Sequence, residues 1–229
     1  MPEKLTVLVV GASRGLGLGL AEEWCGRDWN VIATERNPSK GLEALARRYQ
    51  NLEIEKLDIT DAASVRRLRE RLAEHRLDIL FVNAGIAKAA GATPATAMEA
   101  DFLDMMLTNA LSPVRLVELF EDLVRADGVI AVMTSGLASI ANNTGGFSEL
   151  YSASKAALNM LMKCFASRHP NDTRAILLVA PGWVRTDMGG SNAPLSIEES
   201  VPLVVETVAR HRGKPGLRFV DRHGNTLPW

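Results

Sequence analysis

The sequence has little cysteine, little histidine and no long apolar run. Its two cysteines, Cys25 and Cys164, lie in apolar, helical-looking contexts without metal-ligand spacing, so we expect two reduced thiols in the core. None of its four histidines pairs with a nearby Cys, Asp or Glu at metal spacing, so we expect no metal site. The first apolar run, Leu5–Val10, is far too short for a membrane span or for the apolar part of a signal peptide. We therefore expect a cytoplasmic protein.

An excess of either charge is also absent. Lys and Arg total 26 and Asp and Glu total 27, which leaves a formal net charge of −1. Proteins that bind nucleic acid or anionic membranes through general electrostatics carry a basic excess. We therefore expect neither as a partner, and a small molecule as the ligand.

What the sequence does contain is a regular alternation of apolar and helical segments. Continuous apolar, β-branched runs predict strands that are buried on both faces, as in a parallel sheet. Helices between such strands predict right-handed crossovers and a doubly wound Rossmann-type α/β fold with helices on both faces. The length of 229 residues suits one domain over the whole chain. The seven predicted strands are Leu5–Val10, Asn30–Thr34, Leu52–Leu57, Asp78–Val82, Val129–Thr134, Arg174–Val179 and Gly216–Val220, the last at an edge.

Six helices are predicted between these strands, and the longest is interrupted or bent near Ser112-Pro113. The least regular segments, Ala87–Ala97 and Met188–Ser196, each follow a strand's carboxyl end, where open α/β sheets bind ligands. The helices are Leu18–Arg27, Gly41–Tyr49, Asp61–His75, Asp101–Arg125, Tyr151–His169 and Ile197–Arg210.

A glycine-rich turn, Gly11-Ala-Ser-Arg-Gly15-Leu-Gly17, joins the first strand to the first helix. Glycine is needed where a turn takes positive φ and where backbone approaches a phosphate closely. The helix N-terminus that follows offers free N–H groups and partial positive charge to a pyrophosphate. The turn therefore indicates a dinucleotide site, with a purely structural turn as the alternative.

The spacing of this turn and the motifs that follow it in order resemble the short-chain dehydrogenase/reductase family. The motifs are Asp58 in Leu-Asp-Ile-Thr, Asn83-Ala-Gly85, Asn109, Ser135, Tyr151-Ser-Ala-Ser-Lys155, and Pro181-Gly182 with Thr186. The resemblance covers nearly the whole chain and implies an NAD(P)-dependent oxidoreductase that interconverts a carbonyl and an alcohol. It implies catalytic roles for Asn109, Ser135, Tyr151 and Lys155. It implies cofactor contacts by Gly11, Ser13, Arg14, Gly15, Leu16, Gly17, Glu35, Arg36, Asp58, Ile59, Asn83, Ala84, Gly85, Tyr151, Lys155, Pro181, Gly182, Val184 and Thr186.

Tyr151, Lys155 and Ser135 also make chemical sense together. A phenol with a pKa near 10 is a poor base at pH 7, so Tyr151 needs help to exchange a proton. Lys155 lies one helical turn away at i+4, where its charge would stabilise the phenolate. Ser135 would hold the substrate oxygen where charge develops. By resemblance, Lys155 also binds the nicotinamide ribose, and Asn109 holds a water that links Lys155 to solvent.

The end of the second strand, Glu35-Arg36, gives conflicting signals about the cofactor. An acid there hydrogen-bonds the 2′-hydroxyl of NAD, whereas an arginine accepts the 2′-phosphate of NADP. We favour NADP over NAD, on the hypothesis that Arg14 and Arg36 flank the phosphate while Glu35 turns to solvent.

Four segments are similar to the C-factor and sniffer-like carbonyl reductases within the family: Leu137–Gly146, Ala153–Met160, Pro181–Gly190 and Phe219–Trp229. Ala180 departs from that branch, where many members have histidine, and this would alter the pocket wall. Only about a dozen residues separate Thr186 from the helix near Glu198, which predicts a shallow, open site without a large lid. Candidates for its apolar wall are Ile86, Leu137, Phe147, Trp183 and Met188.

The alternative to an enzyme is a C-factor-like signalling or regulatory protein that binds a dinucleotide with little turnover, because fold alone does not settle function. The intact set of Asn109, Ser135, Tyr151 and Lys155 favours the enzyme. By resemblance, we also expect a homodimer or homotetramer formed by the helices Asp101–Arg125 and Tyr151–His169. The second helix carries Ala157, Leu158, Leu161, Met162 and Phe165, more apolar surface than one core side needs.

Overall fold

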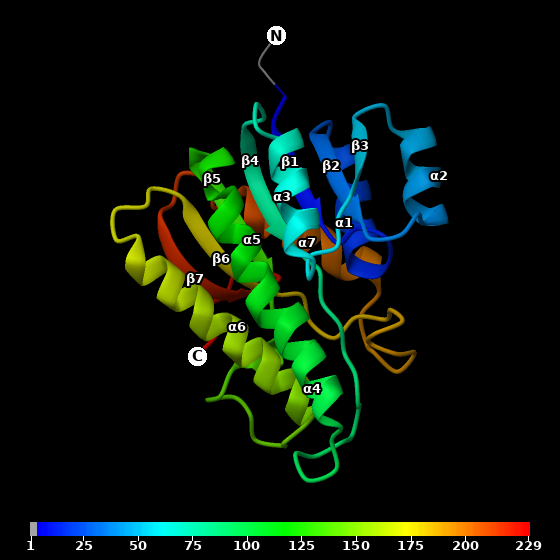
Figure 1. The fold of residues 1–229 in the computed structure, drawn as a ribbon, viewed down its shortest axis with the longest axis vertical. Coiled ribbons are helices and arrows are strands. Elements are labelled where there is room, and N and C mark those ends of the chain that lie inside the picture. Colours follow the sequence, from blue (N-terminus) through cyan, green and yellow to red (C-terminus); the bar gives the residue numbers. More distant parts are fainter. Residues whose placement is uncertain (1–3) are drawn as a thin grey trace.

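A seven-stranded parallel sheet runs through the centre of the molecule, whose computed structural model describes residues 4–229 (Figure 1). The strand order is β3-β2-β1-β4-β5-β6-β7, so the chain winds outward from β1 to one edge and then from β4 to the other. This order confirms the predicted doubly wound fold, with β7 at an edge. The strands are β1 (Thr6–Val10), β2 (Asn30–Glu35), β3 (Leu52–Lys56), β4 (Leu77–Val82), β5 (Val124–Met133), β6 (Ala175–Ala180) and β7 (Gly216–Asp221).

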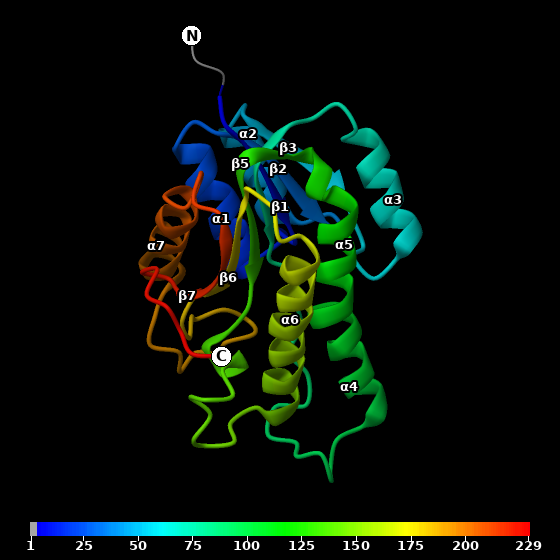
Figure 2. The ribbon, with the colours of Figure 1, turned by 90° about the vertical axis from the view of Figure 1, so that its left-hand side faces the viewer.

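Helices cover both faces of the sheet (Figure 2). The helices α1 (Gly15–Gly26), α2 (Lys40–Arg48) and α7 (Ile197–Ala209) pack on one face. The helices α3 (Ala62–Arg71), α5 (Ser112–Phe120) and α6 (Glu149–Arg168) pack on the other, and α4 (Glu99–Met106) leads into α5. Because successive side chains of a strand point to opposite faces, Val7 and Val9 enter one core while Leu8 and Val10 enter the other. Burial on both faces explains why the strand sequences are continuously apolar.

The region predicted as one helix over Asp101–Arg125 is more complex. The predicted interruption near Ser112-Pro113 is a π-helical turn, η1 (Leu107–Leu111), which lies between α4 and α5 and ends just before Ser112. In a regular α-helix the N–H of residue 113 would bond to the carbonyl of Asn109, but Pro113 has no N–H. A wider, π-helical turn at this point therefore costs no backbone hydrogen bond. The helical region ends in a short 3₁₀ turn, η2 (Glu121–Leu123).

Strand β5 begins at Val124, five residues before the predicted start, and pairs with Leu77 ahead of a register shift. Gly128 lies at this irregularity, where a Cβ would come within 2.8 Å of the Asp78 carbonyl oxygen. A close backbone approach at glycine, which apolar patterning does not report, therefore accounts for the error at this strand end.

Two expectations about side chains are also wrong. Cys25 is buried as predicted, and burial raises its pKa to about 12, but Cys164 is exposed. It lies on α6 away from the face whose residues Leu158, Met162 and Phe165 are fully buried in the core. These three residues were also expected to supply surface for self-association, and they do not. The apolar residues that α4–α6 expose are Phe102, Leu103, Leu111, Leu119 and Met160.

Within residues 4–229, no cluster of His, Cys, Asp and Glu side chains could hold a metal ion. None of the helices described is both long enough and apolar enough to cross a membrane.

Candidate active site

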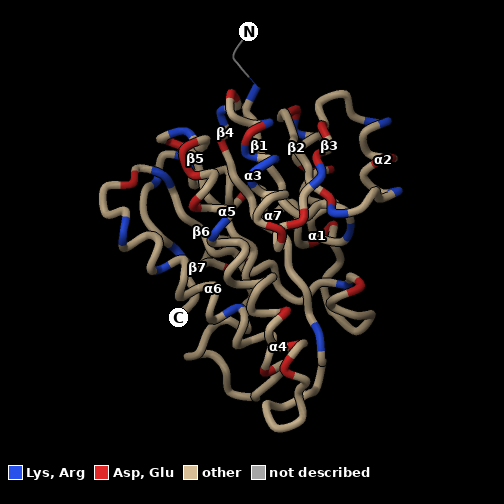
Figure 3. Tube along the Cα trace, viewed as in Figure 1, with Lys and Arg blue, Asp and Glu red and all other residues tan. Residues whose placement is uncertain are grey.

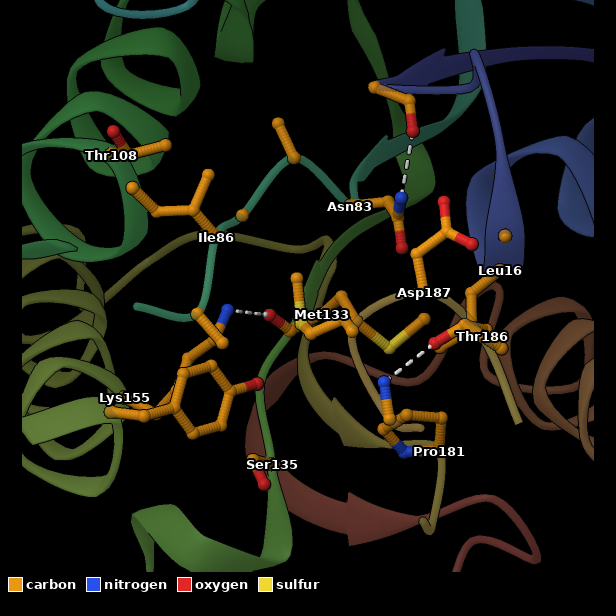
Figure 4. A pocket seen from close by; sticks show the side chains of 18 of the residues that line it. Leu16, Asn83, Ile86, Thr108, Met133, Ser135, Lys155, Pro181, Thr186 and Asp187 are labelled. Carbon is orange, nitrogen blue, oxygen red and sulfur yellow. Dashed lines mark hydrogen bonds between the residues drawn. The ribbon is translucent and has the colours of Figure 1, made fainter. Parts of the chain in front are cut away.

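A cavity of about 870 Å³ opens where the carboxyl ends of the central strands meet the glycine-rich turn. Nearly all of the predicted site residues line it, although they come from seven separate segments of the chain (Figure 4). Those that line it are Gly11, Ser13, Arg14, Gly15, Leu16, Glu35, Arg36, Asp58, Ile59, Asn83, Ala84, Gly85, Ser135, Tyr151, Lys155, Pro181, Gly182, Val184 and Thr186. Gly17 and Asn109 lie behind the lining.

The glycine-rich turn packs so closely against neighbouring backbone that two of its positions have no room for a side chain. Gly11 has a φ of +85°, and a Cβ there would lie within 2.9 Å of Ala84 atoms. Gly17 packs behind the turn, where a Cβ would lie 2.0 Å from the Gly11 carbonyl oxygen. That oxygen accepts a 2.8 Å hydrogen bond from Asn83 Nδ2, so the predicted Asn83-Ala-Gly motif braces the turn from β4.

Helix α1 begins within this turn and presents its N-terminus to the cavity. Its N-cap residue, Arg14, makes no side-chain capping bond, and the first turn of the helix contains no acidic residue. The first N–H groups of a helix lack partners within the helix and carry partial positive charge. This end of α1 therefore suits an anion such as a pyrophosphate.

Ser135 follows β5, while Tyr151 and Lys155 lie in the first half of α6, and all three residues line the cavity. The Ser135 hydroxyl accepts a 3.1 Å bond from the Leu137 N–H, and it lies near enough to the Tyr151 hydroxyl to lower the pKa of that phenol. The Lys155 Nζ atom donates a 3.0 Å bond to the Met133 carbonyl oxygen and lies 5.9 Å from the centre of the Tyr151 ring.

Burial dominates the electrostatics of this group. It raises the pKa of Tyr151 to about 12, against the opposing effect of the Ser135 hydrogen bond. Burial also lowers the pKa of Lys155 to about 8. The Ser135 side chain is the group that lowers the pKa of Tyr151 here, and the expected lowering by Lys155 stays a prediction.

Asn109 is fully buried in the π-helical turn and does not reach the cavity surface. Its Oδ1 accepts from the Ile86 N–H at 2.8 Å, and its Nδ2 donates to the Ile86 carbonyl at 2.8 Å and to Ser154 Oγ at 3.0 Å. Both Asn109 Oδ1 and Lys155 Nζ lie against Gly85, within 3.4 Å of where a Cβ would stand. Asn109 thus links Ile86, in the segment beside Lys155, to Ser154 of α6. Its role in a water relay remains a prediction.

At the far end of the cavity, Glu35 does not turn to solvent as expected. Its side chain is buried, and its Oε2 accepts a 2.8 Å bond from the Ser39 N–H at the start of α2. Arg36 and Arg14 are exposed and line the cavity. The charge of Arg36 contributes to lowering the pKa of Asp58, whose Oδ1 also accepts bonds from the Thr60 N–H and hydroxyl.

The segment after β6 closes the near side of the cavity. Ser200 Oγ donates a 2.8 Å bond to the Pro181 carbonyl, and Thr186 Oγ1 accepts a 3.0 Å bond from the Gly189 N–H. All five residues expected in the apolar wall line the cavity. Ala180 does not, because it is buried in the core at the end of β6.

Sequence reasoning missed several lining residues, among them Thr34, Thr60, Met133, Leu150 and Asp187. Thr34 bonds the turn directly, since its Oγ1 accepts a 3.0 Å bond from the Gly11 N–H. Its position at the carboxyl end of a predicted strand was the available signal. Asp187, whose Oδ2 pairs with Arg14 Nη1 at 3.1 Å across the cavity mouth, had no such signal.

The chain belongs to the short-chain dehydrogenase family, whose model matches residues 5–194, and is thus an NAD(P)-dependent oxidoreductase. Similar solved structures include a short-chain dehydrogenase/reductase of Burkholderia multivorans with bound NADP, 48% identical with a TM-score of 0.97 over 99% of this chain and 100% of that one. A carbonyl reductase of Pseudomonas aeruginosa in complex with NADP is 41% identical with a TM-score of 0.93, over 99% and 100% of the two chains. The C-signal protein of Myxococcus xanthus is 34% identical over 67% of this chain and 93% of its own length. These similarities confirm the predicted family and its C-factor and carbonyl reductase branch.

Proposed function

We propose that this protein reduces a carbonyl compound to an alcohol with NADPH, and that Tyr151 supplies the proton. One observation carries the proposal: Tyr151, Ser135 and Lys155 line the same cavity that the N-terminus of α1 enters. Groups that exchange a proton and groups that suit a pyrophosphate thus meet in one site.

The residues around the cavity fit a dinucleotide. The uncapped N-terminus of α1 would hold the pyrophosphate, Asp58 and Ile59 would contact the adenine, and the segment Pro181–Thr186 would enclose the nicotinamide. When bound, the nicotinamide supplies or accepts the hydride, which no side chain of the protein can do.

We favour NADP over NAD because two guanidinium groups, those of Arg14 and Arg36, line the cavity together with Glu35, although Arg14 also pairs with Asp187. The carboxylate of Glu35 is bonded to the Ser39 N–H, so it stays near the ribose position and weakens this preference without reversing it. The NADP bound in the two similar bacterial structures supports the choice.

Reduction is the direction that the protonation state favours. With a pKa of about 12, Tyr151 is a neutral phenol at physiological pH and can donate its proton to a substrate oxygen. The Ser135 hydroxyl would hold that oxygen, and the Lys155 ammonium would stabilise the phenolate left behind. In the opposite direction Tyr151 would first have to lose its proton, which requires a more basic solution.

The second candidate is a signalling protein that binds the dinucleotide without turnover, and the similarity to the C-signal protein favours it. A screen of aldehydes and ketones that follows the absorbance of NADPH and NADH separates the two. We expect NADPH oxidation with at least one carbonyl compound. Tight NADPH binding without oxidation by any of them would favour the signalling function instead.

We also infer that the chain forms a homodimer or homotetramer through α4–α6, where Phe102, Leu103, Leu111, Leu119 and Met160 are exposed. Light scattering on the purified protein tests this. A monomer at micromolar concentration would contradict it.

A further inference from the structure

Three segments around one end of the cavity contain no charged residue. Residues 89–98, 136–148 and 188–197 lack Asp, Glu, Lys and Arg, although these residues make up 23% of the chain. All three lie at the end of the molecule toward which the carboxyl ends of the strands point (Figures 1 and 2). In Figure 3 the trace is tan throughout these segments, whereas Lys, Arg, Asp and Glu recur along the rest of the chain. We call these three segments the uncharged rim of the cavity.

Large apolar side chains are exposed on or beside this rim. Phe147, Trp183 and Met188 are 62%, 51% and 50% exposed, and all three line the cavity on the side of Tyr151. A scattered exposed apolar residue needs no explanation, but a cluster of them around the mouth of a site indicates a surface that becomes covered by a ligand.

Phe147 and Trp183 form a corner that offers ring surfaces and no polar contact. Their ring centres lie 6.4 Å apart with an angle of 57° between the planes. The indole Nε1 of Trp183 already donates a 2.8 Å bond to the Gly189 carbonyl oxygen, so it is not available to a ligand. The corner can therefore contribute apolar contact and ring stacking.

The charged residues that line the cavity beside the rim are already paired. Lys88 lines the cavity, but its Nζ contacts Asp104 at 2.5 Å and Asp101 at 3.3 Å. Asp187 pairs with Arg14. An ionised group on a substrate would lose its hydration at the rim and would gain no free counter-charge there, and that loss is costly.

We infer that the substrate is an uncharged, lipophilic carbonyl compound whose apolar body extends from the reacting carbon over Leu137, Phe147, Trp183 and Met188. This inference rests on the proposed function, because the position of the reacting carbon is set by Ser135 and Tyr151. The rim recognises the substrate by the apolar area that it covers rather than by a polar headgroup.

A homologous series of aldehydes tests the inference: butanal to decanal, each compared with the aldehyde of equal length that ends in a carboxylate. We expect kcat/KM with NADPH to rise about two- to fourfold per added methylene until the rim is covered, since burial of one methylene corresponds to about a fourfold change. The carboxylate-ended compounds should fall at least about tenfold below their neutral counterparts of equal length.

Variants locate the effect on the rim. Phe147→Ser and Trp183→Ser should flatten the rise with chain length, so that kcat/KM falls more for decanal than for butanal. Ile140→Ser is the matched control, because Ile140 is 79% exposed on the same uncharged segment but lies outside the cavity lining. A kcat/KM independent of chain length, or a preference for the carboxylates, would overturn the inference while leaving the proposed function standing. Absence of NADPH oxidation with every aldehyde would overturn both.

Discussion

Replacement of Lys155 by methionine should stabilise the folded protein while removing its activity. The Lys155 side chain is only 3% exposed, and its Nζ has one hydrogen bond, to the Met133 carbonyl. Burial lowers its pKa from 10.5 to about 8, so the ammonium is less stable in the folded protein than in the unfolded chain. A depression of this size corresponds to about 3 kcal/mol. Methionine leaves the Met133 carbonyl without that donor, which costs about 1 kcal/mol, so the net gain expected is about 2 kcal/mol.

The dependence on pH makes this prediction specific. Between pH 8 and 10.5 the unfolded wild-type chain binds a proton at Lys155 that the folded protein has released, so wild-type stability gains from rising pH. The advantage of Lys155→Met should therefore be full at pH 7 and should shrink toward pH 10. Urea denaturation followed by circular dichroism measures both values. A variant less stable than the wild type at pH 7, or an advantage that does not change with pH, would refute the reasoning.

Three further outcomes follow from the site. Because Lys155 loses its charge above its pKa of about 8, the rate of carbonyl reduction should be nearly constant from pH 6 to 7.5 and should fall above pH 8. A rate that rose between pH 6 and 9 would contradict the role of the ammonium. Glu35→Ala should strengthen NADPH binding by roughly three- to tenfold by removing a carboxylate from the 2′-phosphate position, and titration by fluorescence would show weaker or unchanged binding if Arg14 and Arg36 do not hold the phosphate. Gly17→Ala should lower the melting temperature strongly, because its Cβ would lie 2.0 Å from the Gly11 carbonyl oxygen. The control Gly145→Ala should leave the melting temperature unchanged, because no atom lies within 4 Å of the added Cβ. Equal melting temperatures for the two variants would argue against this packing of the turn.

The parts of the fold that depend on local patterns were predictable. Val7 to Val10 are all apolar because each faces one of two cores, and a continuous run of this kind carries the signal of a buried parallel strand. The glycine-rich turn and Ser135 could be placed in one site because each follows a strand end, and parallel strands end at one edge of the sheet. Tyr151 lies in α6 and was placed there by its resemblance to a family motif.

The errors arose where distant segments decide a local outcome. The exposure of Cys164 depends on which face of α6 meets the sheet, and an apolar helix does not specify that face sharply. The Arg14–Asp187 pair joins segments that are far apart in the sequence, so no local pattern could reveal it. The position of Glu35 is different: it is fixed by the Ser39 N–H four residues later, in the irregular segment between β2 and α2, where apolar patterning carries no signal.

The proton donated by Tyr151 is the centre of this account, and Tyr151→Phe tests it most directly. Phenylalanine keeps the ring and removes the hydroxyl, so the fold and the dinucleotide site should remain. NADPH affinity measured by fluorescence titration should stay within about twofold, while kcat for carbonyl reduction should fall by about 10²- to 10⁴-fold, the usual contribution of a positioned general acid. A variant that binds NADPH normally and reduces the carbonyl at the wild-type rate would contradict the account.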